Sequence, residues 1–372
     1  RTPGAPEGTK GISLFIVPKF FVNDDGSLGD RNDVKCIGLE DKLGIHASPT
    51  CVMSFGENDG ATGWLIGAEN TGMAAMFTMM NNARLNVGIQ GVGLAEQATQ
   101  LAMSYAADRV QGRAPDAERG DNTPVPISTH PDVRNMLMTM RALTDAARAI
   151  CYENGVFHDL AHFGGDERAK AFNELLTPIS KAFSTDIANE VSSLGVQIHG
   201  GMGFVEETGI AQFARDAKIL PIYEGTNGIQ AIDLINRKLP LANGAILSEY
   251  LTQIEETITH CASEETLKEL SAALENGLAD LRAATDFMMT HPDKLDRLYG
   301  ATDYLTLFGL VAGGHYLARG ALGTMKTNEM THKVKTATFF MDRLLPRTKG
   351  HLASILSAKE HLDNEEIFHI VG

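Results

Sequence analysis

The pattern of hydrophobic and polar positions changes near residue 70. Before that point, short apolar runs rich in β-branched and aromatic residues alternate with turn-forming segments such as NDDGSLGD, which is typical of β-structure. Residues 1–68 are therefore predicted to form a β-rich domain. The expected strands lie in GISLFIVP (11–18), TCVMSF (50–55) and ATGWLIG (61–67).

From residue 70 onwards, apolar positions recur at helical spacing. Within 70–111 we expect two helices that meet near Asn81. Gly88, Gly91 and Gly93 in this stretch would let other backbones approach closely, at some cost in helix propensity. Further helices are expected at 132–163 and at 167–196, with a shorter one that ends near residue 217.

A second helical block follows the linker-like segment PLANGA at 240–245. Its apolar positions again recur with the helical period, at 247–261, 301–323 and 334–358. Long helices in succession favour an up-and-down bundle. The predicted fold class is therefore α+β, mostly α, with domains at 1–68, 69–239 and 240–372.

Charge and composition exclude several classes of function. The 372 residues contain 32 basic and 47 acidic side chains, a net charge of -15, which opposes binding to nucleic acid or to anionic lipid. No apolar run approaches the length of a membrane span, and neither Cys nor His residues show metal-ligand spacing. These features predict a cytoplasmic protein with reduced cysteines.

The chain begins without Met, in RTPGAPEGTKG, a loop-like segment that leads directly into an expected strand. This start suggests a fragment that lacks an N-terminal part.

Glu224 stands out because its near neighbours in LPIYEGTNGIQAIDLI (220–235) are mostly apolar or small. One interpretation is helix chemistry, in which Thr226 or Asn227 caps the following helix and Glu224 adds negative charge near its positive end. The other is a general base, because a poorly solvated carboxylate has a raised pKa and can remove a carbon-bound proton. The spacing alone does not separate the two.

Two further motifs also allow two interpretations. QIHGGMGF (197–204) follows a helix rather than a strand, so it is either a tight interhelical turn or a place where glycine N–H groups meet a phosphate or an adenine. Arg109 either complements a helix C-terminus or clamps a pyrophosphate. Arg84 is more typical of a surface or interhelix ion pair than of a ligand site.

Taken together, three segments resemble the acyl-CoA dehydrogenase family across about residues 8–237. GVQIHGGMGFVEETGIAQFARDAKILPIYEGTNGIQ is similar to the family's C-terminal signature. ARLNVGIQGVGLAEQA resembles the helix ahead of it, and KLGIHASPTCVMSF resembles the middle β-domain. The block after residue 240 resembles a helical extension of one branch, and GTKGISLFIVPK with YEGTNGIQA looks closest to the 3-methylmercaptopropionyl-CoA dehydrogenases.

The resemblance implies FAD-dependent dehydrogenation of an acyl-CoA, with Glu224 as the base that removes the α-proton. In some branches the base instead lies on the earlier helix, where this chain has Ala83. Arg84, Asn81, Tyr223 and Gly225 would contact substrate, although the family often has Asp at the position of Asn81.

The resemblance also implies the cofactor contacts. Arg109 would bind the FAD pyrophosphate, and Thr226 and Gln230 would touch the flavin nucleotide. Gln197, Gly200 and Gly201 would meet the adenine part of a neighbouring subunit's FAD.

Other partners and competing functions follow from the same resemblance. Family members are homodimers or homotetramers that pass electrons to an electron-transfer flavoprotein, and their N-terminal helical domain has no counterpart here. A short thioether-containing acyl-CoA is the expected substrate, with ordinary short- or medium-chain acyl-CoA next. The alternatives are an acyl-CoA oxidase, or a non-catalytic DNA-binding relative, which the charge of -15 opposes.

Overall fold

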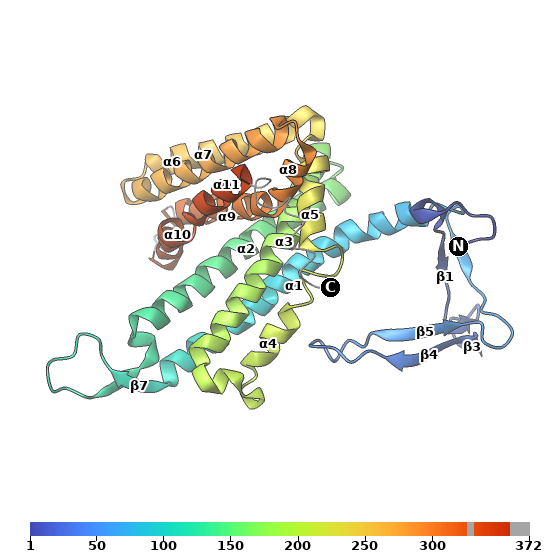
Figure 1. Ribbon diagram of the computed structural model, residues 1–372, viewed down its shortest axis with the longest axis horizontal. Helices are drawn as coiled ribbons and strands as arrows, with labels where there is room; N and C mark the ends of the chain where they lie inside the picture. The colour runs from blue at the N-terminus through green and yellow to red at the C-terminus, as the bar shows by residue number, and fades with distance from the viewer. Residues whose placement is uncertain (326–330, 358–372) are drawn as a thin grey trace, which may run out of the picture. The chain divides into compact units, whose positions relative to one another are not determined.

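The computed structural model describes residues 1–325 and 331–357. The chain divides into two compact units, residues 1–83 and residues from 84 onwards. Paired strands make up much of the first unit, and long helices dominate the second (Figure 1). The predicted fold class, α+β and mostly α, is therefore confirmed.

Three antiparallel strand pairs form the sheet structure of the first unit. Each run predicted to contain a strand does contain one. Two features were missed. One is the hairpin on either side of the predicted loop NDDGSLGD. The other is the strand at 34–39, in which lysine and glycine interrupt the apolar pattern. The pairs are β1 (Leu14–Ile16) with β6 (Trp64–Ile66), β2 (Phe20–Val22) with β3 (Leu28–Arg31), and β4 (Val34–Leu39) with β5 (Cys51–Phe55).

A buried amide connects separate segments of this unit. Asn32 is 4% exposed. Its Nδ2 donates to the carbonyl oxygens of Pro18 and Thr62 at 2.9 and 2.8 Å, and its Oδ1 accepts from the Thr62 N–H at 3.0 Å. All of its polar atoms are therefore satisfied, and the side chain ties the segment after β1 to the one before β6.

The first long helix, α1 (Gly72–Asp108), is continuous, so the prediction of two helices meeting near Asn81 was wrong. Asparagine lowers helix propensity by only a fraction of a kcal/mol, about 0.5 relative to alanine, which is too little to end a helix in which no proline occurs. The division between the two compact units nevertheless falls within α1, after Ala83.

The remaining elements follow closely on one another. The helices predicted at 132–163 and 167–196 are confirmed within a few residues, as is the shorter one ending at 217. A short hairpin, β7 (Val110–Arg113) with β8 (Pro124–Pro126), follows α1. The later helices are α2 (Pro131–Gly164), α3 (Glu167–His199), α4 (Ile210–Ala217), α5 (Asn227–Asp233), α6 (Ala245–Ala262), α7 (Lys268–Thr290), α8 (Lys294–Tyr299), α9 (Ala301–Met325), α10 (Thr331–Arg343) and α11 (Arg347–Leu356).

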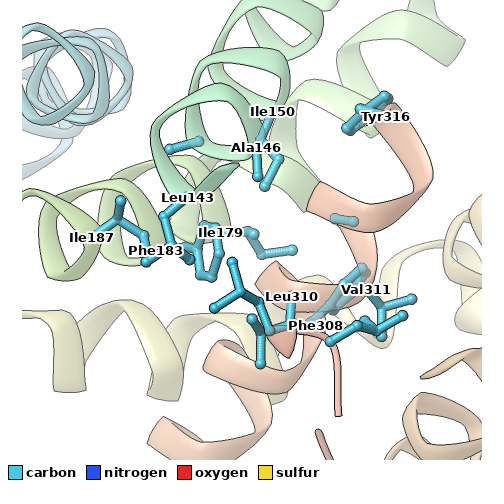
Figure 2. Close-up of a cluster of buried hydrophobic side chains, with 14 of the residues drawn as sticks. Leu143, Ala146, Ile150, Ile179, Phe183, Ile187, Phe308, Leu310, Val311 and Tyr316 are labelled. Atoms are coloured by element: carbon cyan, nitrogen blue, oxygen red, sulfur yellow. The ribbon is translucent and has the colours of Figure 1, made fainter. Parts of the chain in front are cut away.

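The core of the second unit joins helices from before and after residue 240. Helices α2 and α3 pack side by side, and α9 packs against both. The contact with α9 is close, because a Cβ on Gly309 would lie 2.3 Å from the ring of Phe183. Figure 2 shows this core, with Leu143, Ala146 and Ile150 from α2, Ile179, Phe183 and Ile187 from α3, and Phe308, Leu310, Val311 and Tyr316 from α9.

Two glycines allow α1 to approach α3 closely. A Cβ on Gly88 would lie 2.6 Å from the carbonyl oxygen of Ser180, and one on Gly91 would lie 2.8 Å from that of Ser184. The close approach predicted for these two glycines is therefore confirmed. The same prediction was wrong for Gly93, which has nothing within 4 Å of its Cβ position.

A charged cluster links α1 to α2. Glu96 accepts hydrogen bonds from Arg141 at 2.8 Å and from Arg148, and both arginines also contact Asp145 on their own helix. Partial burial would raise the pKa of Glu96, but the hydrogen bonds from Arg141, Gln100 and Arg148 outweigh it and lower this pKa to about 2.

We expect Glu96→Gln to lower the free energy of unfolding by about 1–2 kcal/mol at pH 7. Because the pKa of Glu96 lies near 2 in the folded state and near 4.5 when unfolded, its contribution is full above pH 4.5 and is lost as the pH falls towards 2. The difference in the free energy of unfolding between wild type and variant, measured with urea, should be smaller at pH 3 than at pH 7. Glu167→Gln, in an exposed pair with Lys170, should change stability little at either pH. A constant difference would contradict this account.

Among residues 1–325 and 331–357, no helix combines the length and apolar character needed to cross a membrane. Within the same ranges, no cluster of three or more His, Cys, Asp or Glu side chains has metal-binding geometry. The four cysteines carry free thiols.

Candidate active site

Glu224 lies in the turn that connects α4 to α5, and its backbone is unusual. Its φ of 56° is in the left-handed region, which is uncommon for a residue other than glycine, and Gly225 follows with a φ of 83°. Thr226 then caps α5, because its side-chain oxygen accepts from the N–H of Ile229 at 3.2 Å. The capping residue is therefore Thr226, and the turn before it sets the direction of the Glu224 side chain.

Three side chains hold the carbonyl groups of this turn. Arg84 of α1 donates from Nε to the Glu224 carbonyl oxygen at 3.5 Å. The Gly225 carbonyl accepts from Lys181 Nζ of α3 at 3.0 Å and from Gln230 Nε2 of α5 at 3.4 Å. Side chains from three helices therefore hold two consecutive carbonyl groups, those of Glu224 and Gly225. These hydrogen bonds stabilise the strained backbone conformation of Glu224.

The carboxylate of Glu224 is half-buried. Within the described part of the chain, it accepts no hydrogen bond and forms no ion pair. Its charge acts on Arg84, Lys181 and Tyr223, whose pKa values it raises. The group is thus a carboxylate near two cations, with its oxygens available to a ligand.

Arg84 is 4% exposed and forms a buried ion pair with Asp233 of α5, with 3.5 Å between Nη1 and Oδ2. Asp233 is also paired with Arg237 one turn later. This is the interhelix ion pair that the sequence favoured for Arg84. Its proposed contact with the substrate stays a prediction.

Lys181 was missed by the sequence reasoning. It lies on α3 with 0% exposure, and its Nζ donates to Asn227 Oδ1 at 2.8 Å as well as to Gly225. A lysine followed by the apolar and small residues of AFST (182–185) is the local signal that could have indicated it. Its partners lie more than 40 residues later, beyond the reach of a periodicity argument.

The other predicted substrate contacts lie in different surroundings. Tyr223 is half-buried, and its hydroxyl donates to the side chain of Gln90 on α1. Burial, and then the charge of Glu224, raise the pKa of Tyr223. Asn81 is exposed on α1, three residues before Arg84, and belongs to the first compact unit.

Gln230 differs from the other candidate cofactor contacts because it is fully buried. Its Oε1 has no hydrogen-bond partner, although its Nε2 reaches Gly225. A buried acceptor without a partner is costly, so this oxygen indicates a place where a donor from a ligand would fit.

The remaining candidates gather where α1 and α3 end. Tyr105 stacks on His199 with ring centroids 4.2 Å apart, so the two helix ends are neighbours. Arg109 is exposed, and its guanidinium donates only to the uncharged Gln111 among the described residues. Gln197, Gly200 and Gly201 are exposed on the α3 side, and both glycines have open space at their Cβ positions.

The structure therefore separates the candidates into two groups. Glu224, Thr226 and Gln230 lie near Lys181, whereas Gly200 follows His199. Since Lys181 and His199 are 18 residues apart on α3, the groups are about 27 Å apart along that helix at 1.5 Å per residue. In the second group, the sequence had assigned Gln197, Gly200 and Gly201 to a neighbouring subunit's FAD and Arg109 to the FAD pyrophosphate. Both assignments stay predictions.

Comparison with known families gives two matches. Residues 70–239 match the family described as acyl-CoA dehydrogenase, C-terminal domain, and residues 250–363 match acetyl-CoA dehydrogenase C-terminal like. The first range includes α1 to α5, and the second begins within α6 and includes α7 to α11.

Curated relatives agree with the family match. The chain is 44% identical over 381 residues to 3-methylmercaptopropionyl-CoA dehydrogenase of Ruegeria pomeroyi, covering 97% of this chain and 63% of that protein. It is 35% identical over 369 residues to a butyryl-CoA dehydrogenase of Syntrophomonas wolfei, covering 95% and 58%. The chain thus spans about three-fifths of the length of these relatives.

Solved structures share the fold. ACDH-11 of Caenorhabditis elegans, in complex with C11-CoA, has a TM-score of 0.75 at 22% identity and covers 95% of this chain and 58% of its own. An acyl-CoA dehydrogenase of Bacillus anthracis, complexed with FAD, has a TM-score of 0.72 at 22% identity, with 90% and 59% covered. These two likenesses show the shared fold. The two family matches, which together span most of the chain, show that it belongs to the acyl-CoA dehydrogenase family.

Proposed function

We propose that the protein catalyses the FAD-dependent α,β-dehydrogenation of an acyl-CoA thioester to the trans-2-enoyl-CoA, with Glu224 as the base. The observation that carries this proposal is the turn at Glu224, where the backbone is fixed by three helices and the carboxylate has no partner among the described residues. Family membership supports it, as do the two curated relatives named as acyl-CoA dehydrogenases.

The residues present fit FAD. The buried Gln230 Oε1 lacks a donor, and the guanidinium of Arg109 has no anionic partner among the described residues, as a pyrophosphate site requires. Gly200 and Gly201 leave their backbones open to close approach. When bound, FAD accepts the hydride that leaves the substrate's β-carbon.

Glu224 acts by taking the α-proton. The α-carbon of a thioester is only weakly acidic, so the carbonyl must be polarised while the proton is removed. The backbone N–H of Glu224 donates to no group in the described structure and is thus open to the developing enolate oxygen. Excluding water from the site strengthens both effects.

The substrate and partners form the finer part of the proposal. A short thioether-containing acyl-CoA, 3-methylmercaptopropionyl-CoA, is supported by the 44% identity to the relative of that name, and butyryl-CoA comes next because of the 35% identity. Electron-transfer flavoprotein as the acceptor, a homodimer or homotetramer, and a cytoplasmic location rest on the sequence reasoning alone. Substrate contacts are assigned to Arg84, Asn81, Tyr223 and Gly225.

Anaerobic mixing of the FAD-loaded protein with each acyl-CoA tests the proposal. Flavin absorbance should bleach faster with 3-methylmercaptopropionyl-CoA than with butyryl-CoA. Absence of bleaching with a panel of short and medium acyl-CoAs would overturn the assigned reaction. In air, stoichiometric oxygen uptake during turnover would show an oxidase rather than a dehydrogenase.

A further inference from the structure

Lys181 is a charged side chain in a place that normally excludes charge. It is 0% exposed and lies in the middle of α3, between the core residues Ile179 and Phe183. Burying an ammonium group costs several kcal/mol, on the order of the penalty for any desolvated ion, unless neighbouring groups offset it. The groups that contact Lys181 therefore indicate how this cost is offset.

The contacts of Lys181 converge on the Glu224 turn. Its Nζ donates to the Gly225 carbonyl at 3.0 Å and to Asn227 Oδ1 at 2.8 Å, which are the residues one and three after Glu224. The backbone N–H of Asn227 donates to Pro221 O at 2.9 Å, which closes the loop on its other side. One ammonium group thus fixes two points of the segment that carries the base.

Asn227 is itself held in a single orientation. Its Nδ2 donates to Asp186 Oδ1 at 2.8 Å, to Thr185 Oγ1 at 3.0 Å and to the Ala182 carbonyl at 3.2 Å. Since its amide nitrogen faces these acceptors, its oxygen must face Lys181. The Asn227 side chain therefore connects the Asp186 carboxylate to the buried ammonium group through two hydrogen bonds.

The charged groups that act on Lys181 come from each element packed around it. Burial lowers its pKa to about 8, against the raising effect of Asp186 on its own helix; Arg84 of α1 lowers the pKa further, and Glu224 of the loop raises it. At pH 7 most of the protein therefore carries the ammonium ion.

We propose that Lys181 is a positioning residue for the base: its buried ammonium fixes the Gly225 carbonyl and the Asn227 side chain, and so holds the turn that carries Glu224. This inference rests on the proposed role of Glu224. It assigns to Lys181 an effect on the geometry of the turn, exerted through two charge-assisted hydrogen bonds.

Flavin reduction in Lys181 variants tests this positioning effect. Lys181→Met, which loses hydrogen bonds and charge, should reduce the flavin at least about tenfold more slowly at saturating substrate, because a small misplacement of a catalytic group is costly. Lys181→Gln keeps a donor without the charge and should lose less rate.

Lys238→Met is the matched control, because Lys238 is a largely buried lysine that pairs with Glu174 instead of the turn. It should keep the wild-type rate of flavin reduction. If the Lys181 variants also keep this rate, the inference is overturned while the proposed function stands. If the wild type is not reduced by any acyl-CoA, the proposed function itself has failed.

A measurement on the flavin-free protein checks the buried charge without catalysis. The pKa of Lys181 is about 8 in the folded state and 10.5 in the reference state. Between these values the unfolded chain binds more protons, so the free energy of unfolding should rise with pH for the wild type relative to Lys181→Met. Lys238→Met should show the same pH dependence of the free energy of unfolding as the wild type. If the wild type instead showed the pH dependence of Lys181→Met, the lysine would carry no buried charge, and the inference would lose its basis.

Discussion

A Glu224→Gln variant is expected to bind FAD and acyl-CoA as the wild type does and yet fail to bleach the flavin when substrate is added without oxygen. The amide has nearly the shape of the carboxylate but cannot accept the α-proton. Loss of a general base slows the chemical step by about 10²–10⁴-fold. Stopped-flow absorbance of the flavin, with bound FAD quantified in each sample, measures the effect.

The turn itself should survive this substitution. The groups that hold it, Arg84, Lys181 and Gln230, contact backbone carbonyls and not the Glu224 side chain. Glu207→Gln is a suitable control, because Glu207 is an exposed carboxylate in the short turn Glu206–Thr208 ahead of α4. Bleaching at the wild-type rate in Glu224→Gln would return Glu224 to the role of a charge near a helix start, and the base would have to be sought elsewhere.

Gly88→Ala is expected to destabilise the second unit although it adds only a methyl group. The new Cβ would lie 2.6 Å from the carbonyl oxygen of Ser180, which belongs to the backbone of α3 and cannot rotate away. Either α1 or α3 must shift, at a cost of about 1–3 kcal/mol. Urea unfolding followed by circular dichroism measures the loss, and the shift should also disturb the nearby Lys181.

Gly93→Ala on the same helix is the matched control. Gly93 has nothing within 4 Å of its Cβ position, so alanine should stabilise α1 by up to about 1 kcal/mol through helix propensity. Equal stability changes of the same sign in the two variants would contradict the close contact between α1 and α3.

Local pattern was sufficient for several of the long helices. Helices α2 and α3 begin and end close to the predicted positions, because each buries one face and is bounded by glycine, proline or a capping residue such as Asp166. Helix α7 was not predicted, and the run predicted at 334–358 divides into α10 and α11, where Pro346 interrupts it. The predicted break near Asn81 was wrong because a single weak helix former does not end a helix. The strand β4 was missed because lysine and glycine mask its alternation.

The candidate site was only partly accessible to sequence. Glu224 could be proposed because an isolated carboxylate among small and apolar neighbours is visible locally. Its left-handed backbone and the convergence of Arg84, Lys181 and Gln230 on two carbonyls depend on three helices that are far apart in the chain. Contacts of that kind leave no periodic signal, which is why Lys181 was missed.

Exchange of the substrate α-proton with solvent tests the central claim most directly. With the flavin already reduced, hydride transfer cannot follow, so incorporation of deuterium from D₂O at the α-carbon of 3-methylmercaptopropionyl-CoA reports on the base alone. The account predicts rapid incorporation with the wild type and with Glu207→Gln, and almost none with Glu224→Gln. Incorporation by Glu224→Gln at the wild-type rate would show that another group removes the proton.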